Sequence, residues 1–313
     1  MRNEGSMKQN ELLVELNAIL SERRNSETMN IDLLSTDEIL SKINDEDHKV
    51  AEAVKVAIPD ITLAVDNIVS AFNDGGRLIY LGAGTSGRLG ILDAVECVPT
   101  FSVPETMVVG IIAGGETAIR SAVEGAEDDQ EAAVADLQAI GFSTKDILVG
   151  IAASGRTPYV LSGLRYARAM KAKTVSVSCN PDSPIGEQVD VNICAAVGPE
   201  ILTGSTRMKS GTAQKIILNM LSTASMIRIG KTYQNLMVDV KASNKKLYAR
   251  AINIVIQATG CNEAQAVEAL DEANFETKVA ILMILADLSA VEAQQILQQN
   301  NGFLRNAVDM KGK

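Results

Sequence analysis

The chain has 313 residues, 46% of them hydrophobic, and a formal net charge of −10 at pH 7. This length allows one large core and a smaller appended unit, and the hydrophobic fraction is typical of a globular α/β protein. The negative charge argues against nucleic acid and anionic membranes as partners, so an anionic substrate must be held by local dipoles and a few placed cations.

No apolar run approaches the roughly 20 residues that a membrane-spanning helix needs, and there is no secretory signal pattern. The four cysteines (Cys97, Cys179, Cys194 and Cys261) lie far apart and form no Cys-x-x-Cys pair. These features predict a cytoplasmic protein with reduced thiols. The single histidine, His48, lies in a polar segment, so the sequence predicts no metal and no cofactor. Any acid–base catalysis is therefore expected from carboxylate side chains.

The first 60 residues are predicted to form an N-terminal helical segment. Apolar residues recur at helical spacing in residues 10–24, and Ser35-Thr36-Asp37-Glu38 is typical of a helix start. A longer helical pattern runs from about residue 45 to residue 72, and Pro59 within it is predicted to begin a new helix. Asn73-Asp74-Gly75-Gly76 then ends that pattern.

From residue 77 onward, strands, turns and helices alternate. Near-continuous apolar runs predict five strands, at residues 77–81, 107–113, 146–152, 174–179 and 191–195. Helices are predicted at residues 87–97, 117–140, 157–170 and 207–229. The alternation predicts a three-layer α-β-α domain over residues 61–230, with a central parallel sheet covered on both faces. Ligands of such sheets bind beyond the carboxyl ends of the strands.

A C-terminal helical subdomain is predicted over residues 231–313, without further strands. It would contain one helix at 239–260 and three short helices at 262–270, 275–285 and 290–297. Two strings resemble a small ubiquitin-associated-type three-helix unit: Ala-Thr-Gly-Cys-Asn-Glu-Ala-Gln-Ala at 258–266 and the closing Asn301-Gly302-Phe303.

The turn after the first predicted strand has the G-x-G-x-x-G spacing of dinucleotide-binding turns, in residues 82–87. That interpretation requires an acidic residue at the end of the next strand, which instead ends in Ala-Gly-Gly. A Walker phosphate loop would need lysine where this chain has Arg88. The turn is therefore predicted to hold a phosphate monoester, with Ser86 also able to cap the following helix. Its predicted binding residues are Gly84, Thr85, Ser86, Gly87 and Arg88.

Two further turns repeat this arrangement of hydroxyl groups, glycine and a helix start. One follows the third predicted strand, where Pro158 would take a first helical position, and the other precedes the helix predicted at 207–229. A hydroxyl in any single turn could be only a helix cap, but three such turns on one sheet favour a ligand. The cations in these turns could pair with the anionic groups of a substrate or with surface carboxylates. The predicted binding residues here are Ser154, Gly155, Arg156, Thr157, Ser205, Thr206 and Lys209.

Serine-bearing turns on a parallel sheet resemble the sugar isomerase (SIS) domain, a phosphosugar-binding fold. Longer strings narrow the resemblance to the N-acetylmuramic acid 6-phosphate etherase family, and the match runs from about residue 31 to near the C-terminus. The strings are Gly-Ala-Gly-Thr-Ser-Gly-Arg-Leu-Gly at 82–90, Val-Glu-Gly-Ala-Glu-Asp at 123–128, Ala-Ser-Gly-Arg-Thr-Pro-Tyr-Val at 153–160, Gly-Ser-Thr-Arg-Met-Lys at 204–209 and Asn-Leu-Met-Val-Asp-Val at 235–240.

The resemblance implies that N-acetylmuramic acid 6-phosphate and water become N-acetylglucosamine 6-phosphate and D-lactate, by elimination and hydration. One carboxylate would remove the C2 proton and another carboxyl group would protonate the departing ether oxygen. In this resemblance the family's two acid–base carboxylates correspond to Glu96 and Glu127. Val95 replaces the serine or similar small residue that the family usually has before the first glutamate. Glu96 is assigned as the general acid, although the division of roles between the two stays open.

Glu96 lies ten residues after Ser86, a separation of about 15 Å if the whole segment is α-helical. Either the segment before Pro99 folds back, or Glu96 serves a site that a second subunit completes. The resemblance favours a homodimer with shared sites, because SIS proteins commonly form one. Two other functions stay open, a non-catalytic phosphosugar-sensing regulator and a hexosamine-phosphate isomerase. The presence of both glutamates, and the lack of a basic DNA-binding domain, argue against the regulator.

Overall fold

The computed structural model describes residues 19–240 and 245–310. The chain divides into two compact units, the first comprising Met1–Ala94 and Val108–Leu221 and the second comprising Val95–Met107 and Ser222–Lys313. Within the helix predicted at 10–24, residues 10–18 lie outside the described residues, and Leu20–Glu22 form a short 3-10 helix, η1. Two more 3-10 helices follow, η2 (Ser26–Thr28) and η3 (Ile31–Leu33).

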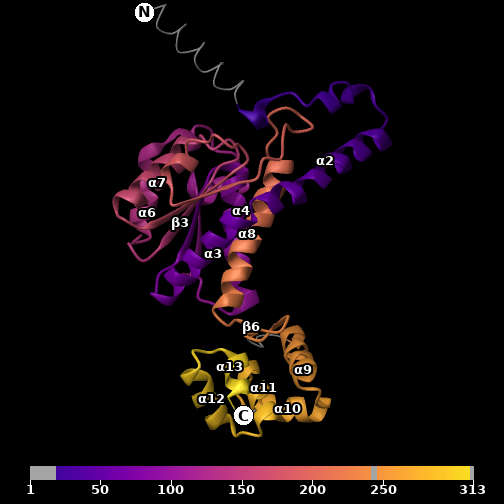
Figure 1. Ribbon diagram of the computed structural model, residues 1–313, viewed down its shortest axis with the longest axis vertical. Coiled ribbons are helices and arrows are strands. Elements are labelled where there is room, and N and C mark those ends of the chain that lie inside the picture. Colours follow the sequence, from indigo (N-terminus) through magenta and orange to yellow (C-terminus); the bar gives the residue numbers. More distant parts are fainter. Residues whose placement is uncertain (1–18, 241–244, 311–313) are drawn as a thin grey trace, which may run out of the picture. The chain divides into compact units, whose positions relative to one another are not determined.

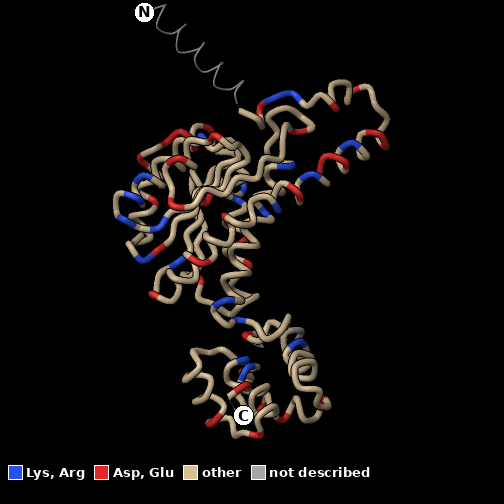
Figure 2. Tube along the Cα trace, in the orientation of Figure 1, with Lys and Arg blue, Asp and Glu red and all other residues tan. Residues whose placement is uncertain are grey.

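The N-terminal helices begin where the sequence predicts. Helix α2 (Thr36–Val56) has a capping box, in which the Ser35 hydroxyl accepts the Glu38 N–H and the Glu38 carboxylate accepts the Ser35 N–H. Acidic and basic residues interleave along this helix (Figure 2). Helix α3 (Ile58–Asn73) has Pro59 in its first turn, which confirms that this proline begins a new helix.

A parallel sheet of five strands, in the order β2-β1-β3-β4-β5, forms the centre of the first unit (Figure 1). All five predicted strands are confirmed. Every residue of β1 and β3 is buried, as expected for central strands covered on both faces. The strands are β1 (Leu78–Gly82), β2 (Val108–Ile112), β3 (Ile147–Ile151), β4 (Lys173–Ser178) and β5 (Val191–Cys194).

Helices cover both faces of this sheet, so the three-layer α-β-α prediction is confirmed (Figure 1). Tyr80 and Leu81 are consecutive strand residues and point to opposite faces. On one face lies α4 (Gly84–Phe101), where a Cβ atom at Gly90 would be 2.9 Å from the Tyr80 Cβ. On the other lies α7 (Pro158–Ala169), where a Cβ atom at Gly163 would be 2.2 Å from a Leu81 methyl carbon. Only glycine permits such close contact between helix and sheet.

The single helix predicted over residues 117–140 is wrong. The segment contains α5 (Gly115–Arg120), the 3-10 helix η4 (Ala126–Asp128) and α6 (Gln130–Ala139). Gly125 has a φ of 74°, which breaks a helix, and the Asp129 carboxylate caps α6 by accepting the N–H groups of Glu131 and Ala132. Glu127 therefore lies on a short turn and not in a long acidic helix.

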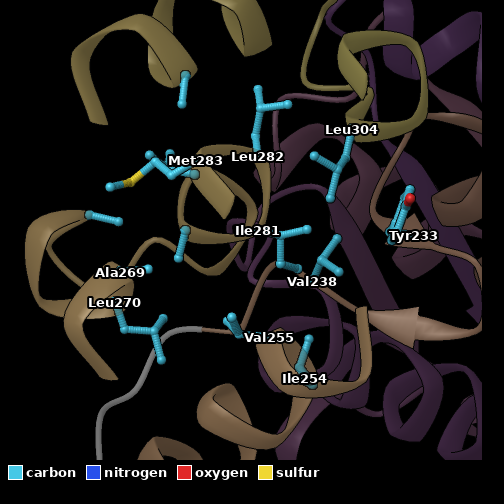
Figure 3. Close-up of a cluster of buried hydrophobic side chains, with 14 of the residues drawn as sticks. Tyr233, Val238, Ile254, Val255, Ala269, Leu270, Ile281, Leu282, Met283 and Leu304 are labelled. Carbon is cyan, nitrogen blue, oxygen red and sulfur yellow. The ribbon is translucent and has the colours of Figure 1, made fainter. Parts of the chain in front are cut away.

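The second unit contains a small hairpin that the sequence did not predict, β6 (Thr232–Tyr233) and β7 (Leu236–Met237). Its helices bury a core that includes Val238, Val255 and Ile281 (Figure 3). Of the helix predicted at 239–260, the structure describes α9 from Lys245 to Thr259. The sequence did not predict α13. The likeness to a ubiquitin-associated unit stays a prediction. Helix α8 (Lys209–Arg228) leads into the hairpin, and the later helices are α9 (Lys245–Thr259), α10 (Glu263–Glu272), α11 (Thr277–Ala286), α12 (Ala290–Gln299) and α13 (Leu304–Asp309).

Within residues 19–240 and 245–310, no single helix is long and apolar enough to cross a membrane. Helices α11 and α12 pass that test only as a pair, bent by 105°. Residues of α11 from Val279 to Met283 belong to the buried core of the second unit.

Candidate active site

The carboxyl edge of the sheet brings two of the predicted turns together. Strands β1 and β3 are parallel neighbours, with Gly82 opposite Ile151. Strand β2 lies on the other side of β1, so the strand order reverses between β1 and β3, and ligands of α/β sheets bind at such a point. The turns that follow Gly82 and Ile151 therefore adjoin one another at the expected binding edge.

The first turn is also the first turn of α4, which begins at Gly84. Ser86 is buried, and its hydroxyl donates a hydrogen bond to Oε1 of Gln214 at 2.9 Å. The prediction that Ser86 caps this helix is wrong, because the helix begins at Gly84 and not at Gly87. The first amide groups of a helix have no intrahelical acceptor and favour an anion, so Gly84, Thr85 and Ser86 suit a phosphate.

The second turn follows β3. The backbone N–H of Arg156 donates to the Ser154 hydroxyl at 3.3 Å, and the Gly155 N–H donates to a backbone carbonyl. Thr157 is the N-cap residue of α7, yet its hydroxyl makes no capping hydrogen bond, and Pro158 lies in the first turn as predicted. Thr157 therefore does not make the side-chain cap that the sequence also allowed, and its role in binding a ligand stays a prediction.

The third turn precedes α8, where Ser205 and Thr206 are half-buried. The Glu200 carboxylate accepts the backbone N–H groups of Lys209 and Ser210, each at 2.9 Å. A protein carboxylate thus already occupies the N-terminus of α8, with the favourable charge for that position. The start of α8 thus holds a carboxylate of the protein itself, whereas the first amide groups of α4 suit a phosphate.

Lys209, predicted to bind substrate, lies in an internal ion pair. Its Nζ atom donates to Oε2 of Glu46 at 2.5 Å, and the two side chains are only 3% and 5% exposed. The second oxygen of Glu46 accepts from Lys49 at 2.6 Å. Because Glu46 holds the ammonium group of Lys209, the substrate role of this lysine stays a prediction.

Glu127 lies near the carboxyl end of β2. It is exposed on η4, and the neighbouring Ala126 packs over Gly114, where a Cβ atom would be 3.3 Å from the Ala126 Cβ. Gly114 lies two residues after the last residue of β2, Ile112. The sheet edge that carries the Ser86 turn therefore also carries this carboxylate, within the same compact unit.

Glu96 lies on α4, which continues without a break through Pro99 to Phe101. The alternative in which the segment before Pro99 folds back is therefore wrong. Ten residues of helix separate Glu96 from Ser86, a rise of about 15 Å. Glu96 is exposed, and beside it on the same helix Leu92 and Val95 are 52% and 60% exposed.

Gln214 is a residue that the sequence analysis missed. It is buried on α8, and besides accepting from Ser86 it has an Nε2 group without a hydrogen-bond partner among the described residues. One turn before it, the buried Ser210 hydroxyl is also without such a partner. The small residue Gly211 on α8 was a signal of close approach, since a Cβ atom there would be 3.4 Å from the Thr85 methyl carbon.

Arg88, also predicted to bind substrate, ties the first turn of α4 to the segment that leads to Glu127. Its Nε donates to the Ile119 carbonyl at 3.1 Å and its Nη2 donates to the Ser121 carbonyl at 3.5 Å. The half-buried hydrogen bond to Ile119 comes from a charged donor and contributes about 1.5–3 kcal/mol, whereas the exposed 3.5 Å contact with Ser121 contributes less. The guanidinium is thus a positioning group for the residues between α5 and η4.

Replacing Arg88 with methionine is expected to accelerate backbone amide exchange in residues 119–128 by about tenfold or more, because loss of 1.4 kcal/mol corresponds to a factor of ten. Hydrogen exchange read by mass spectrometry measures this without substrate. The matched control is Arg120→Met, which removes an exposed arginine from α5 itself. Equal exchange in the Arg88 variant and the wild type would contradict the positioning role.

Within the described ranges, no group of three or more histidine, cysteine, aspartate or glutamate side chains is arranged to hold a metal ion. His48 is exposed, and its Nδ1 atom lies 2.7 Å from the Asn44 carbonyl on the same helix. The amides and hydroxyls at the sheet edge can bind an anion, and the carboxylate of Glu127 can transfer a proton.

Comparison with known proteins gives three matching family models. The SIS domain matches residues 128–224, the glucokinase regulatory protein N-terminal SIS domain matches residues 60–168, and the C-terminal lid domain of glucokinase regulatory protein matches residues 234–280. Among solved structures, a phosphoheptose isomerase from Francisella tularensis covers 61% of this chain and 99% of its own, with 19% identity and a TM-score of 0.47.

Full-length relatives are much more similar. A protein named N-acetylmuramic acid 6-phosphate etherase from Pseudoalteromonas atlantica is 68% identical over 302 residues, covering 96% of this chain and 98% of the relative. A protein of the same name from Colwellia psychrerythraea is 60% identical over 304 residues, covering 97% of this chain and 99% of the relative.

Proposed function

Because this chain belongs to the N-acetylmuramic acid 6-phosphate etherase family, it is an enzyme, and we propose that it converts N-acetylmuramic acid 6-phosphate and water into N-acetylglucosamine 6-phosphate and D-lactate. The observation that carries this proposal is the sheet edge. There the Ser86 and Ser154 turns follow adjacent strands, and Glu127 lies on η4, whose Ala126 packs against Gly114 just after β2.

The reaction is that of a carbon–oxygen lyase followed by hydration. The sugar ring opens to an aldehyde, which acidifies the proton on C2. A carboxylate removes that proton, a double bond forms between C2 and C3, and the ether oxygen leaves C3 with the lactyl group and takes a proton from a carboxylic acid. Water then adds to C3, and C2 regains a proton.

The sugar phosphate would be held by the two turns at the switch point. The amide groups at the start of α4 and the hydroxyls of Ser154 and Thr157 offer donors to a C6 phosphate. The Ser86 hydroxyl, which donates to Gln214 in this structure, would turn its one O–H toward the phosphate when substrate binds. Glu96 and Glu127 would then serve as the two acid–base groups at C2 and C3. Their exposure in a single chain is consistent with a site that closes around substrate or is completed by a second chain.

A direct assay tests the function. Purified protein is incubated with N-acetylmuramic acid 6-phosphate, and D-lactate is measured by a coupled enzyme; release in equal amount to N-acetylglucosamine 6-phosphate is expected. No lactate above the blank would overturn the assignment. In H₂¹⁸O, elimination and hydration place the label on C3 of the sugar, whereas displacement at the lactyl carbon places it in lactate.

A homodimer with shared sites accounts for the position of Glu96. On α4 this residue is about 15 Å from Ser86, too far for one hexose phosphate to bridge comfortably, and the exposed Leu92 and Val95 beside it suit burial against a second copy. We propose that Glu96 of one chain completes the phosphate turn of the other.

Mixing inactive Glu96→Ala and Ser86→Ala chains is expected to restore about a quarter of wild-type activity. Random exchange makes half of the dimers mixed, and each mixed dimer has one intact site of two. The measurement is D-lactate release after the chains are unfolded and refolded together. Each variant refolded alone is the control, and activity no higher than these controls would contradict shared sites.

We also propose that the enzyme works in the cytoplasm and that residues 61–230 form its phosphosugar-binding domain, between an N-terminal helical segment and a C-terminal helical subdomain at 231–313. The first part is supported by the four cysteines, all free thiols, which suit a reducing compartment. The second is supported by the five-stranded sheet, whose strands all lie between Leu78 and Cys194.

A further inference from the structure

The second compact unit contains a cavity of about 720 Å³, within the range of small-molecule sites. Its polar lining includes Lys231, Asp239, Thr277, Lys278, Gln294 and Gln298, and all of its lining residues belong to that unit. None of the residues assigned above to the phosphosugar site lines it. Asp239 belongs to the string at 235–240, to which the etherase reaction gives no role.

Two lysines share one carboxylate in this cavity. Oδ2 of Asp239 accepts from Lys231 at 3.1 Å and from Lys278 at 3.0 Å. The side chains of Lys231, Asp239 and Lys278 are 24%, 18% and 14% exposed, so all three are largely withdrawn from water. The pair of ammonium groups leaves one positive charge in surplus over Asp239.

The remaining acidic lining residue does not cancel this surplus. Glu276 is exposed and takes part in no ion pair with another described residue. Burial lowers the pKa of Lys278, the charge and hydrogen bond of Asp239 raise it, and the charge of Lys231 lowers it. A bound anion would supply the negative charge that the two lysines lack.

Other lining groups suit the same kind of ligand. Helix α11 begins in the cavity, and its N-cap residue, Glu276, provides no side-chain cap, so the amide groups of Thr277 and Lys278 can face an anion. The exposed side chains of Gln294 and Gln298, which also line the cavity, carry amide groups that are further donors. Val238, Val240 and Leu297 add an apolar wall, which suits a small organic body attached to the anionic group.

We propose that this cavity, which we call the Lys231–Lys278 pocket, is a second binding site, for a small oxyanion with a phosphate or carboxylate group. Ser102, the first residue after α4, also lines it, so an occupant would contact the chain immediately beyond the helix that carries Glu96. The site is separate from the proposed function and does not depend on it.

Hydrogen exchange with inorganic phosphate tests the proposal, with sodium chloride at equal ionic strength as the blank and D-lactate as the carboxylate probe. Phosphate is expected to slow amide exchange at residues 274–280, and Lys278→Met is expected to weaken that effect at least tenfold. Arg250→Met, which removes an exposed cation from the same unit, should bind as wild type does. If Lys278→Met does not fold, Lys231→Met gives the same test at the more exposed lysine.

The outcomes separate this site from the active site. Protection of residues 274–280 that persists in Ser86→Ala supports the pocket, even if the lactate assay fails. Protection confined to residues 84–88, or protection at 274–280 that is equal in wild type and Lys278→Met, would overturn it and leave the etherase assignment untouched. Slower exchange with phosphate but not D-lactate would assign the pocket to phosphates, and the reverse would assign it to carboxylates.

Discussion

Replacing Glu127 with glutamine is expected to lower kcat for D-lactate release by about 10²- to 10⁴-fold, the usual contribution of a positioned acid or base. Glutamine has nearly the same shape but cannot exchange a proton. Glu127 is exposed on η4, so the substitution should leave the stability of the fold unchanged. Steady-state kinetics with the coupled lactate assay measure the loss.

Exchange of the C2 proton with D₂O then assigns the role of each carboxylate. If Glu127 is the base, Glu127→Gln loses both C2 exchange and lactate release, whereas Glu96→Gln keeps the exchange. If Glu127 is the acid, the pattern reverses. The control is Asp128→Asn, an exposed carboxylate on the same short helix. A kcat for Glu127→Gln near that of this control would remove Glu127 from the reaction.

Replacing Lys209 with methionine is expected to lower the free energy of unfolding by about 3–5 kcal/mol, because it leaves a buried carboxylate without its main partner. Glu46 and Lys209 are almost fully buried, and the remaining partner, Lys49, is half exposed to solvent. Urea denaturation at pH 7 measures the loss. Lys49→Met is the matched control, and an exposed partner of this kind contributes about 1 kcal/mol or less.

The pH dependence of stability gives the same pair a second test. Burial alone would raise the pKa of Glu46, but hydrogen bonds from Lys209, Lys49 and Asn25, and the charge of Lys209, lower it to about 2. The folded-state pKa is below the ordinary value of 4.5, so this contribution is complete above pH 4.5 and is lost as the pH falls toward 2. Lys209→Met should flatten that part of the stability profile.

These measurements also decide between two roles for Lys209. A lysine that served the substrate would leave stability unchanged when replaced, and KM would rise instead. Replacing Glu46 and Lys209 together by methionine should recover most of the lost stability, since an apolar pair removes the unpaired charge. A stable Lys209→Met variant with a raised KM would return this residue to the substrate site.

The centre of the sheet could be predicted from the sequence because β1 and β3 are short and have no charged or strongly polar residue, which is a local signal. The Ser86 turn could be placed for the same reason, since it directly follows β1. The break before Glu127 could not, because residues 117–140 are rich in alanine and acids, and the break depends on the positive φ of Gly125. A glycine permits a positive φ but does not require it, and isolated glycines are tolerated within helices.

The sequence pattern also could not predict which side chains pair with residues that lie far away in the chain. The hydrogen bond from Ser86 to Gln214 spans 128 residues, and the ion pair between Lys209 and Glu46 spans 163. In the sequence, Lys209 is a cation beside a hydroxyl-rich turn, and Glu46 is one carboxylate in a polar helix. Only the folded chain shows that the two neutralise each other.

The contacts of Gly90 with Tyr80 and of Gly163 with Leu81 have a consequence for how this enzyme can evolve. A methyl group added at Gly90 would meet the Cβ of Tyr80 and push α4, and the turn at its start, away from the sheet. One added at Gly163 would displace the buried Leu81 side chain under α7. These turns begin at Gly84 on α4 and Thr157 on α7. A mutational scan would therefore score both glycines together with the substrate-binding positions, although their close contacts are with residues of β1. Libraries that aim at new sugar phosphates should keep these two positions fixed and vary the exposed loops.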